Sequence, residues 1–467
     1  MLGAMLLVFM CFGFVIYLAS QASFAGANLV AIICVASIIL LFTLIDVEFG
    51  IYCLMAGMLL SPEIRFDFIQ LTRRDFFIRI DDIMILTVGV AWFAQAVAKG
   101  KLSLLKDSPL NWPILTFTFL TALSTARGTF TGAVGSPITA FFYVLKFTEF
   151  FLLYFLIINN IKTEEQVKRI MTSYFLTVVM VVAWATWTTI ITGEFGRATT
   201  PFETDEEPAT LGGYLLFSFC LAFGLLTHAT SIVSRVTYLA LMAAIIPPFL
   251  YTLSRGSYLA FIPSFFAVFL LSRRRAIPII VLIIACFAIP WIPAATIQRV
   301  EYTFENRLEP VRGEKPGEGQ IVLDPSSAAR LQRYKGVLWQ WAYRPLLGQG
   351  VTGVGFVDSQ IVRVLGEVGI LGLCSLIWIF KSLLQSTIRL YRVLPDGYMR
   401  GLVLGLMSGT VGLLFHSSTA NTFTIVRIAG PFWAVCGLIM AVYNIYFQPR
   451  SVPARVTTRS LPAKVTK

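Results

Sequence analysis

The sequence has few charged residues and lacks the motifs that carry most soluble enzyme chemistry. Charged residues make up only 13% of its 467 positions, and histidine occurs twice. There is no Walker sequence, no GxSxG nucleophile elbow, no HExxH zinc motif and no GxGxxG turn in a dinucleotide-binding context. These absences exclude the usual ATP-driven and NAD-dependent reactions. We therefore expect a protein that works without a cofactor.

Cysteine is absent from the polar segments. All seven cysteines fall within apolar stretches, so the chain has neither a disulfide framework nor the ligand spacing of a zinc site. We expect these cysteines to behave as small apolar core residues.

Long apolar runs dominate what is present. Hydrophobic residues make up 57% of the chain, and its apolar runs are long enough to cross a hydrocarbon core about 30 Å thick. The net charge of +12 comes from Lys and Arg at segment ends, without the basic and aromatic surface of a nucleic-acid-binding protein. We predict an all-α polytopic membrane protein with about 14 transmembrane helices, at 1–20, 27–45, 48–61, 82–98, 110–126, 138–159, 168–192, 209–228, 232–253, 256–272, 275–292, 361–380, 398–416 and 428–447.

Lys and Arg near the segment ends predict the orientation of the chain. With fourteen crossings, the basic connections at 99–106, 160–169 and 273–275 all fall on one side, which is then the cytoplasm. These assignments divide the chain into a bundle of about 11 helices at 1–292, a large extracytoplasmic loop at 293–360, C-terminal transmembrane helices at 361–447 and a basic cytoplasmic tail at 448–467.

The large loop at 293–360 is the longest polar interval in the sequence. Its SSAARLQRYKGVLWQWAYRP stretch predicts a helix, and the glycine-rich LLGQGVTGVGF stretch leads the chain back to the membrane. A second outward interval, 62–81, alternates apolar and polar residues and predicts a short hairpin or an interfacial segment. Farther on, Gly401, Gly405 and Gly409 form a small-xxx-small pattern that indicates close helix packing.

The outward face collects arginines, against the usual bias of positive charge toward the cytoplasm. Arg255 is the most informative, because it interrupts the apolar run IIPPFLYTLSRGSYLAFIPSFF. It is either a guanidinium clamp for phosphate oxygens or a residue that snorkels to the membrane surface from a tight turn. The clamp gains weight because more arginines face the same compartment, where they would suit a pyrophosphate: Arg197, Arg330, Arg333 and Arg427.

Two acidic residues follow the glycine-rich stretch. Asp358 is either the N-cap of the next helix or a general base that takes a proton from a sugar hydroxyl, and the two roles are compatible. Glu367 is either a buried hydrogen-bond partner that holds the glycine-rich turn or a residue of the substrate site.

Three further features have two interpretations each. His416 closes a predicted span and is either a hydrogen-bonded interface histidine or part of the substrate site. The acidic run 203–207 is either a metal site or a solvated loop. Lys146 and Glu149 lie three residues apart within an apolar span, where they either form a structural pair or mark a transport pathway.

Several short motifs occur in a recognisable order. GRATTPF is followed by SRGSYLAF, then by a large outer loop with an arginine-bearing helix, and then by a helix that reads LGEVGILGL. In this order they resemble the superfamily of O-antigen ligases and Wzy-type O-antigen polymerases, most clearly between Arg197 and Leu373. Members of the family are integral membrane glycosyltransferases with a large periplasmic loop, and the resemblance implies a GT-C-like fold.

The resemblance implies a donor glycan linked to undecaprenyl diphosphate and a site on the periplasmic face of the bacterial inner membrane. It implies that Arg197 and Arg255 hold the pyrophosphate, with Arg330 as a third contact, and that Asp358 deprotonates or orients the acceptor hydroxyl. The reaction would be inverting and would need no metal, because arginines neutralise the leaving group. The predicted substrate site is completed by Arg333, Glu367, His416 and Arg427.

Ligases of this family carry a histidine just after the glycine-rich stretch, where this chain has Asp358 in FVDSQIV. The difference favours polymerisation of repeat units over ligation of glycan to a lipid A core or a protein. The implied partners are the lipid-linked donor, a glycan or lipid A-core acceptor, the bilayer and a chain-length regulator. A transporter or flippase is the third alternative, but it would bury its ionisable groups near the bilayer midplane, whereas the arginines and Asp358 of this chain gather at the outer face.

Overall fold

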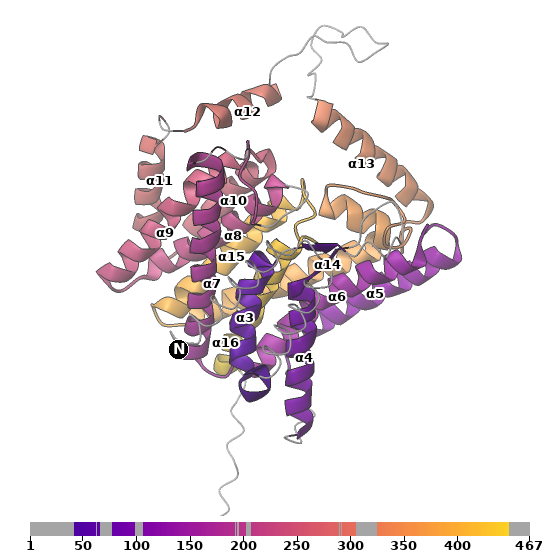
Figure 1. Ribbon diagram of the computed structural model, residues 1–467, viewed down its shortest axis with the longest axis horizontal. Helices are drawn as coiled ribbons and strands as arrows, with labels where there is room; N and C mark the ends of the chain where they lie inside the picture. Colours follow the sequence, from indigo (N-terminus) through magenta and orange to yellow (C-terminus); the bar gives the residue numbers. More distant parts are fainter. Residues whose placement is uncertain are drawn as a thin grey trace, which may run out of the picture.

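The computed structural model describes residues 42–61, 63–65, 77–98, 106–191, 193, 196–201, 207–288, 290, 292–304 and 325–447. These residues are helical apart from connections and one short hairpin (Figure 1). The elements are α3 (Val47–Leu60), β1 (Glu63–Arg65), β2 (Phe77–Arg79), α4 (Ile80–Ala98), α5 (Asn111–Phe130), α6 (Pro137–Asn160), α7 (Glu164–Thr186), the π-helical turn η1 (Trp187–Ile191), α8 (Pro208–His228), α9 (Ile232–Tyr251), α10 (Arg255–Leu271), α11 (Ala276–Ala288), α12 (Ala294–Phe304), α13 (Pro325–Tyr343), α14 (Gln360–Val393), α15 (Tyr398–His416) and α16 (Val426–Phe447).

Seven of the described helices are long and apolar enough to cross a membrane: α6, α7 with η1, α8, α9, α14, α15 and α16. In a helix the backbone N–H and C=O groups form hydrogen bonds with each other, and hydrocarbon offers them no other partners. The prediction of a polytopic helical membrane protein is therefore confirmed for the described part of the chain. The count of fourteen stays a prediction, because α3 and α10 are apolar but have only 14 and 17 residues, and the first predicted span lies outside the described residues.

Helix α8 forms the centre of the bundle. Within its apolar window 94% of the residues are buried, compared with 28% for the peripheral α9. The glycines of α15 face α8 so closely that a Cβ atom on Gly405 would lie 2.7 Å from the Cα atom of Leu221. The packing predicted from Gly401, Gly405 and Gly409 is therefore confirmed.

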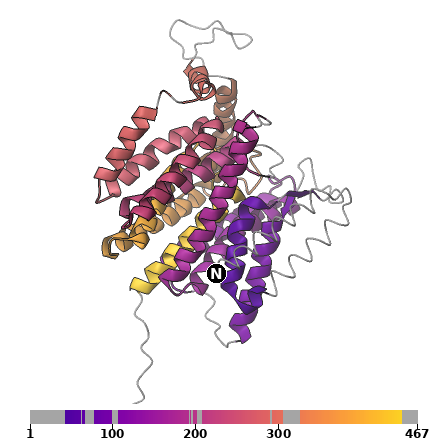
Figure 2. The same ribbon diagram turned by 60° about the vertical axis from the view of Figure 1, so that its left-hand side comes forward.

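The described part of the large loop lies at one end of the molecule. Both ribbon views place α12 at the end opposite the C-terminal end of α16 (Figures 1 and 2). Helix α13 matches the helix predicted within the loop. It connects through the glycine-rich stretch to α14, so the loop closes back onto the bundle.

The predicted hairpin is confirmed. Strands β1 and β2 pair in antiparallel fashion with Ile64 opposite Ile78, while residues 66–76 lie outside the described part. Directly after β2, the buried Asp81 accepts hydrogen bonds from Arg79 Nε at 2.9 Å and from Ser61 Oγ at 2.6 Å. These contacts attach the hairpin to the end of α3.

Lys146 and Glu149 form the predicted structural pair. Their Nζ and Oε2 atoms lie 3.1 Å apart on α6, and Lys146 also pairs with Asp82 at the start of α4. The pair is partly buried and joins two neighbouring helices. A structural role therefore accounts for both charges.

The cysteines follow the prediction only in part. Three of the five cysteines in the described residues are buried, whereas Cys286 and Cys374 are exposed on α11 and α14. An apolar thiol costs little where a helix faces lipid rather than protein, so burial in a protein core is not required.

Candidate functional site

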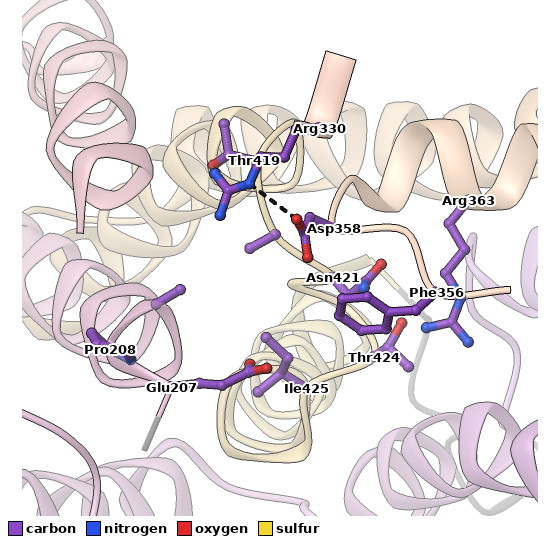
Figure 3. A pocket seen from close by; sticks show the side chains of 12 residues that line it. Glu207, Pro208, Arg330, Phe356, Asp358, Arg363, Thr419, Asn421, Thr424 and Ile425 are labelled. Atoms are coloured by element: carbon purple, nitrogen blue, oxygen red, sulfur yellow. Dashed lines mark hydrogen bonds and ion pairs between the residues drawn. The ribbon is translucent and has the colours of Figure 1, made fainter. Parts of the chain in front are cut away.

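A pocket of about 330 Å³ opens where α8, α13, α14 and the α15–α16 connection meet (Figure 3). Its volume lies at the lower end of the range for small-molecule sites. The lining combines two arginines, two carboxylates and several neutral polar groups, from Glu207, Pro208, Ala209, Arg330, Phe356, Asp358, Arg363, Thr419, Ala420, Asn421, Thr424 and Ile425.

Asp358 and Arg330 face each other across the mouth of this pocket. Arg330 Nε donates to Asp358 Oδ2 at 3.0 Å, and 45% of the Arg330 side chain and 31% of the Asp358 side chain are exposed. The pair is thus accessible to a ligand. Two residues that the sequence assigned to one site are therefore brought together.

Asp358 is not the N-cap of α14, and that interpretation of the sequence was wrong. The cap is Ser359, whose Oγ accepts a hydrogen bond from Val362 N. The helix begins one residue later than expected, so the Asp358 carboxylate is left to pair with Arg330 instead.

Helix α13 positions Arg330 because apolar contacts anchor the helix one and two turns farther along. Val337 packs with Val354 and Val357 in a small buried cluster, against which Tyr334 also lies. Burial raises the pKa of the Tyr334 hydroxyl, so this residue stays neutral. Arg333, which was predicted to bind substrate, is exposed and donates to the carbonyl of Phe356 at 3.3 Å without lining the pocket.

Arg255 lies beside the pocket rather than in its lining. It is the first residue of α10, and its Nη2 donates to Ser326 Oγ at 2.8 Å. Ser326 is one helical turn before Arg330 on α13, and residues four apart share a helix face. The next residue, Gly256, packs against Thr419 of the pocket lining. Arg255 therefore lies next to the residues that line the pocket, without lining it.

Arg197 and Arg427 do not line the pocket. Arg197 is exposed and forms no side-chain hydrogen bond or ion pair within the described residues. Arg427 is only 1% exposed and donates to Thr200 Oγ1 and to the carbonyl of Pro201, the latter at 2.6 Å. Arg427 thus holds the segment after Arg197 against α16, and the predicted roles of both residues in substrate binding stay predictions.

His416 is fully buried. Its Nε2 lies 3.1 Å from Ser257 Oγ and its Nδ1 lies 2.8 Å from Thr422 Oγ1. Both ring nitrogens therefore have partners inside the bundle, as the interface interpretation of the sequence predicts. The ring joins α10 and the α15–α16 connection behind the pocket wall.

The glycine-rich stretch packs backbone to backbone against a break in α14. Gly369, with φ 77°, interrupts the helix, and Gly350 N donates to the carbonyl of Glu367 at 2.8 Å. The Glu367 side chain is 2% exposed and accepts from Thr352 N at 2.9 Å. The interpretation of Glu367 as the residue that holds the glycine-rich turn is therefore confirmed.

Sequence reasoning missed Arg363, which lines the pocket although only 8% of it is exposed. Arg363 Nε donates to Glu367 Oε2 at 3.2 Å, and its guanidinium carbon lies 5.7 Å from the centre of the Tyr143 ring. The signal was available: an arginine and a glutamate four residues apart on an apolar helix form a pair on one face.

Asn421 and Thr424 were also missed, because the α15–α16 connection has no motif that marks it. Asn421 Nδ2 donates to the carbonyl of Val357 at 2.6 Å, and Figure 3 places its amide beside Asp358 and Phe356. Of the acidic run 203–207 the structure describes Glu207, which is exposed and lines the pocket, and its other acidic residues lie outside the described part.

Two comparisons with known proteins found no match for this chain. No known family model matches the chain, and a search of curated proteins finds no significant match. The resemblance inferred from the short motifs therefore stays a prediction.

The arrangement can bind a ligand that is both anionic and rich in hydroxyl groups. Guanidinium groups bind phosphate oxygens through parallel hydrogen bonds, and the carboxylate of Asp358 and the amide of Asn421 suit sugar hydroxyls. The pocket also adjoins the N-terminal end of α8, where the helix dipole favours negative charge.

Proposed function

We propose that this chain is a membrane glycosyltransferase that polymerises O-antigen or exopolysaccharide repeat units carried on undecaprenyl diphosphate. The observation that carries the proposal is the accessible pair of Asp358 and Arg330, 3.0 Å apart in a polar pocket of a membrane protein. A carboxylate can accept the proton of an acceptor hydroxyl, and an arginine can stabilise a departing diphosphate. One site thus holds the two groups that glycosyl transfer from a lipid diphosphate needs.

The reaction follows from these two groups. The acceptor hydroxyl oxygen attacks the anomeric carbon from the face opposite the diphosphate, and its proton passes to the Asp358 carboxylate. The bond between the anomeric carbon and the diphosphate oxygen breaks, and its electron pair leaves with the diphosphate. Arg330 and Arg255 offset the growing negative charge. The product has the inverted configuration.

Arg330 changes partner during this cycle. Before the donor arrives it is paired with Asp358. The diphosphate carries more negative charge than one carboxylate, so it attracts Arg330 away and leaves Asp358 free for the acceptor. Binding of the donor thereby prepares the site for the acceptor.

A second cavity suits the lipid part of the donor. It has a volume of about 640 Å³ and lies between α10 and α15. Its lining is apolar and begins two turns along α10 from Arg255, so a prenyl chain could occupy it while its diphosphate lies near Arg255. The lining residues are Ile262, Pro263, Phe266, Ala267, Leu270, Leu271, Val411 and Phe415.

The experiment is the lipid-linked glycan profile of a deletion strain complemented with variants. Without the protein we expect single repeat units on undecaprenyl diphosphate to accumulate. Asp358→Asn should reduce chain formation by about 10²–10⁴-fold, and Arg255→Ala by about 10²–10³-fold. Both variants should still insert into the membrane at wild-type levels, as measured by immunoblotting of membrane fractions.

Arg344→Ala is the matched control, because Arg344 lies just after α13 but pairs with Thr131 at 2.7 Å outside the pocket. It should restore full polymerisation. Long lipid-linked chains in the deletion strain would mean a ligase instead of a polymerase. Wild-type activity of Asp358→Asn would remove the proposed base.

A further inference from the structure

We propose that the outer side of α13 lies in the headgroup region of the extracytoplasmic leaflet, so that α13 is an interfacial helix held between the protein and the lipid. This inference concerns how the helix meets the bilayer, and it does not depend on the reaction proposed above.

Helix α13 has two unlike sides. The inner side carries Arg330, Tyr334 and Val337, which contact the pocket wall and the buried valine cluster. The outer side, defined by Leu331, Leu338, Trp339 and Tyr343, turns away from the protein. Spacings of three or four, seven and eight residues keep each set on one side of a helix.

The outer side exposes much more apolar surface than a water-facing helix would normally carry. Trp339 and Tyr343 are each 66% exposed, Leu331 is 45% exposed and Leu338 is 41% exposed. The two aromatic rings form an edge-to-face pair with centroids 4.8 Å apart. Trp and Tyr are the side chains enriched where membranes meet water, because their rings have an apolar body and a polar tip.

This surface is continuous with the lipid-facing side of a membrane span. Arg344 Nη1, at the end of α13, donates to Thr131 Oγ1 just beyond α5, at 2.7 Å. The adjacent Phe130 is 91% exposed. Helix α6, one of the seven helices that can cross a membrane, begins a few residues later and carries its own exposed apolar row at Ile138, Phe141 and Leu145.

The position of the helix supports a lipid surface rather than a soluble partner. In the view of Figure 1, α13 runs across the direction of α5 and α6 and meets the end of their hairpin. A helix at the outer end of the span α6 is in position to lie against the membrane surface. Lys335 also lies on the outer side, where its long side chain can extend its ammonium group to the headgroups.

The test is the depth of spin labels on α13 in nanodiscs of phosphatidylethanolamine and phosphatidylglycerol. Labels are attached at Trp339→Cys and Tyr343→Cys in a background in which all seven cysteines are replaced. Collision rates are then measured with oxygen, which concentrates in hydrocarbon, and with a water-soluble nickel chelate. At both positions the logarithm of the oxygen-to-nickel ratio should be higher than at the matched control, Gln340→Cys.

Gln340 suits this comparison because it is also exposed and directly follows Trp339, but points about 100° away around the helix. Equal ratios at positions 339, 340 and 343 would overturn the proposal and leave the surface open to a glycan or a soluble protein.

A second measurement needs no cysteine replacement. In nanodiscs of brominated lipid, wild-type fluorescence should be quenched more strongly than that of Trp339→Phe, because Trp339 lies within reach of the bromines. Trp341→Phe, which removes a tryptophan on the inner side, should be quenched at least as strongly as the wild type. Identical quenching in wild type and Trp339→Phe would also overturn the proposal.

Discussion

Two buried residues of opposite charge, Arg363 and Glu367, form an ion pair next to the pocket. Arg363 and Glu367 are both almost completely buried and lie one helical turn apart on α14, with Nε and Oε2 3.2 Å apart. Glu367 also accepts from Thr352 N, so each of its carboxylate oxygens has a donor. A buried pair of this kind adds little net stability by itself, but loss of one partner leaves the other charge unpaired.

Glu367→Ala should therefore lower stability by about 3–5 kcal/mol, seen as a lower unfolding midpoint in detergent. Glu367→Gln should cost less, because an amide still accepts from Thr352 N. Asp358→Ala is the surface control: its partly exposed ion pair should contribute at most about 1 kcal/mol. Equal midpoints for Glu367→Ala and Asp358→Ala would contradict the assigned role of Glu367.

At the scale of elements, the break in α14 decides where the pocket forms. The helix before Gly369 carries Arg363 and Glu367 toward the pocket, and the helix after it crosses the membrane. The backbone of the glycine-rich stretch fills the gap at the break, with Ile370 N donating to the carbonyl of Pro345 at 2.9 Å. If α14 were continuous, the glycine-rich stretch could not pack at this position. The turn that carries Asp358 would then be displaced as well.

Gly369→Ala should disrupt this junction. The positive φ disfavours a side chain by about 1–2 kcal/mol, and the new Cβ atom would lie 2.6 Å from Leu347 N. We expect a lower unfolding midpoint together with loss of glycan transfer. Gly336→Ala on α13 is the matched control, because a Cβ atom there meets nothing within 4 Å. This variant should be neutral or stabilising by up to about 1 kcal/mol. A lower unfolding midpoint for Gly336→Ala than for Gly369→Ala would refute this account.

At the scale of the whole molecule, the proposed function depends on the orientation of the chain in the membrane. The pocket and α13 lie at the end that the distribution of Lys and Arg assigns to the outside. The connection between α8 and α9, which contains the exposed Thr230, is assigned to the cytoplasm. A donor diphosphate exposed only on the outer leaflet could reach the pocket only in this orientation.

Cysteine labelling in intact cells measures the orientation directly. In a cysteine-free background, Gln340→Cys on α13 should react with a membrane-impermeant maleimide, whereas Thr230→Cys should react only after the membrane is permeabilised. Labelling of Thr230→Cys in intact cells would reverse the assigned orientation and exclude a site on the outer face.

The sequence predicted the features that depend on local chemistry. Apolar runs predicted helices because hydrocarbon leaves the backbone no other partners, and the spacing of Lys146 and Glu149 predicted a pair on one helix face. The alternation at 62–81 predicted a short hairpin or an interfacial segment, of which the structure shows the paired strands. The RVLGE spacing contains the signal for the Arg363–Glu367 pair. The sequence alone does not determine the number of spans, because short apolar helices such as α3 need not cross a membrane.

Only the tertiary structure decided which of the outward residues share one site. Arg330 and Asp358 meet although they lie 28 positions apart in the sequence, while Arg427 is withdrawn into the bundle to hold Thr200 and Pro201. Asn421 joins the pocket from a connection without a motif. Each outcome depends on how α13, α14 and the α15–α16 connection pack, and packing between distant segments is not encoded in the periodicity or spacing of any one of them.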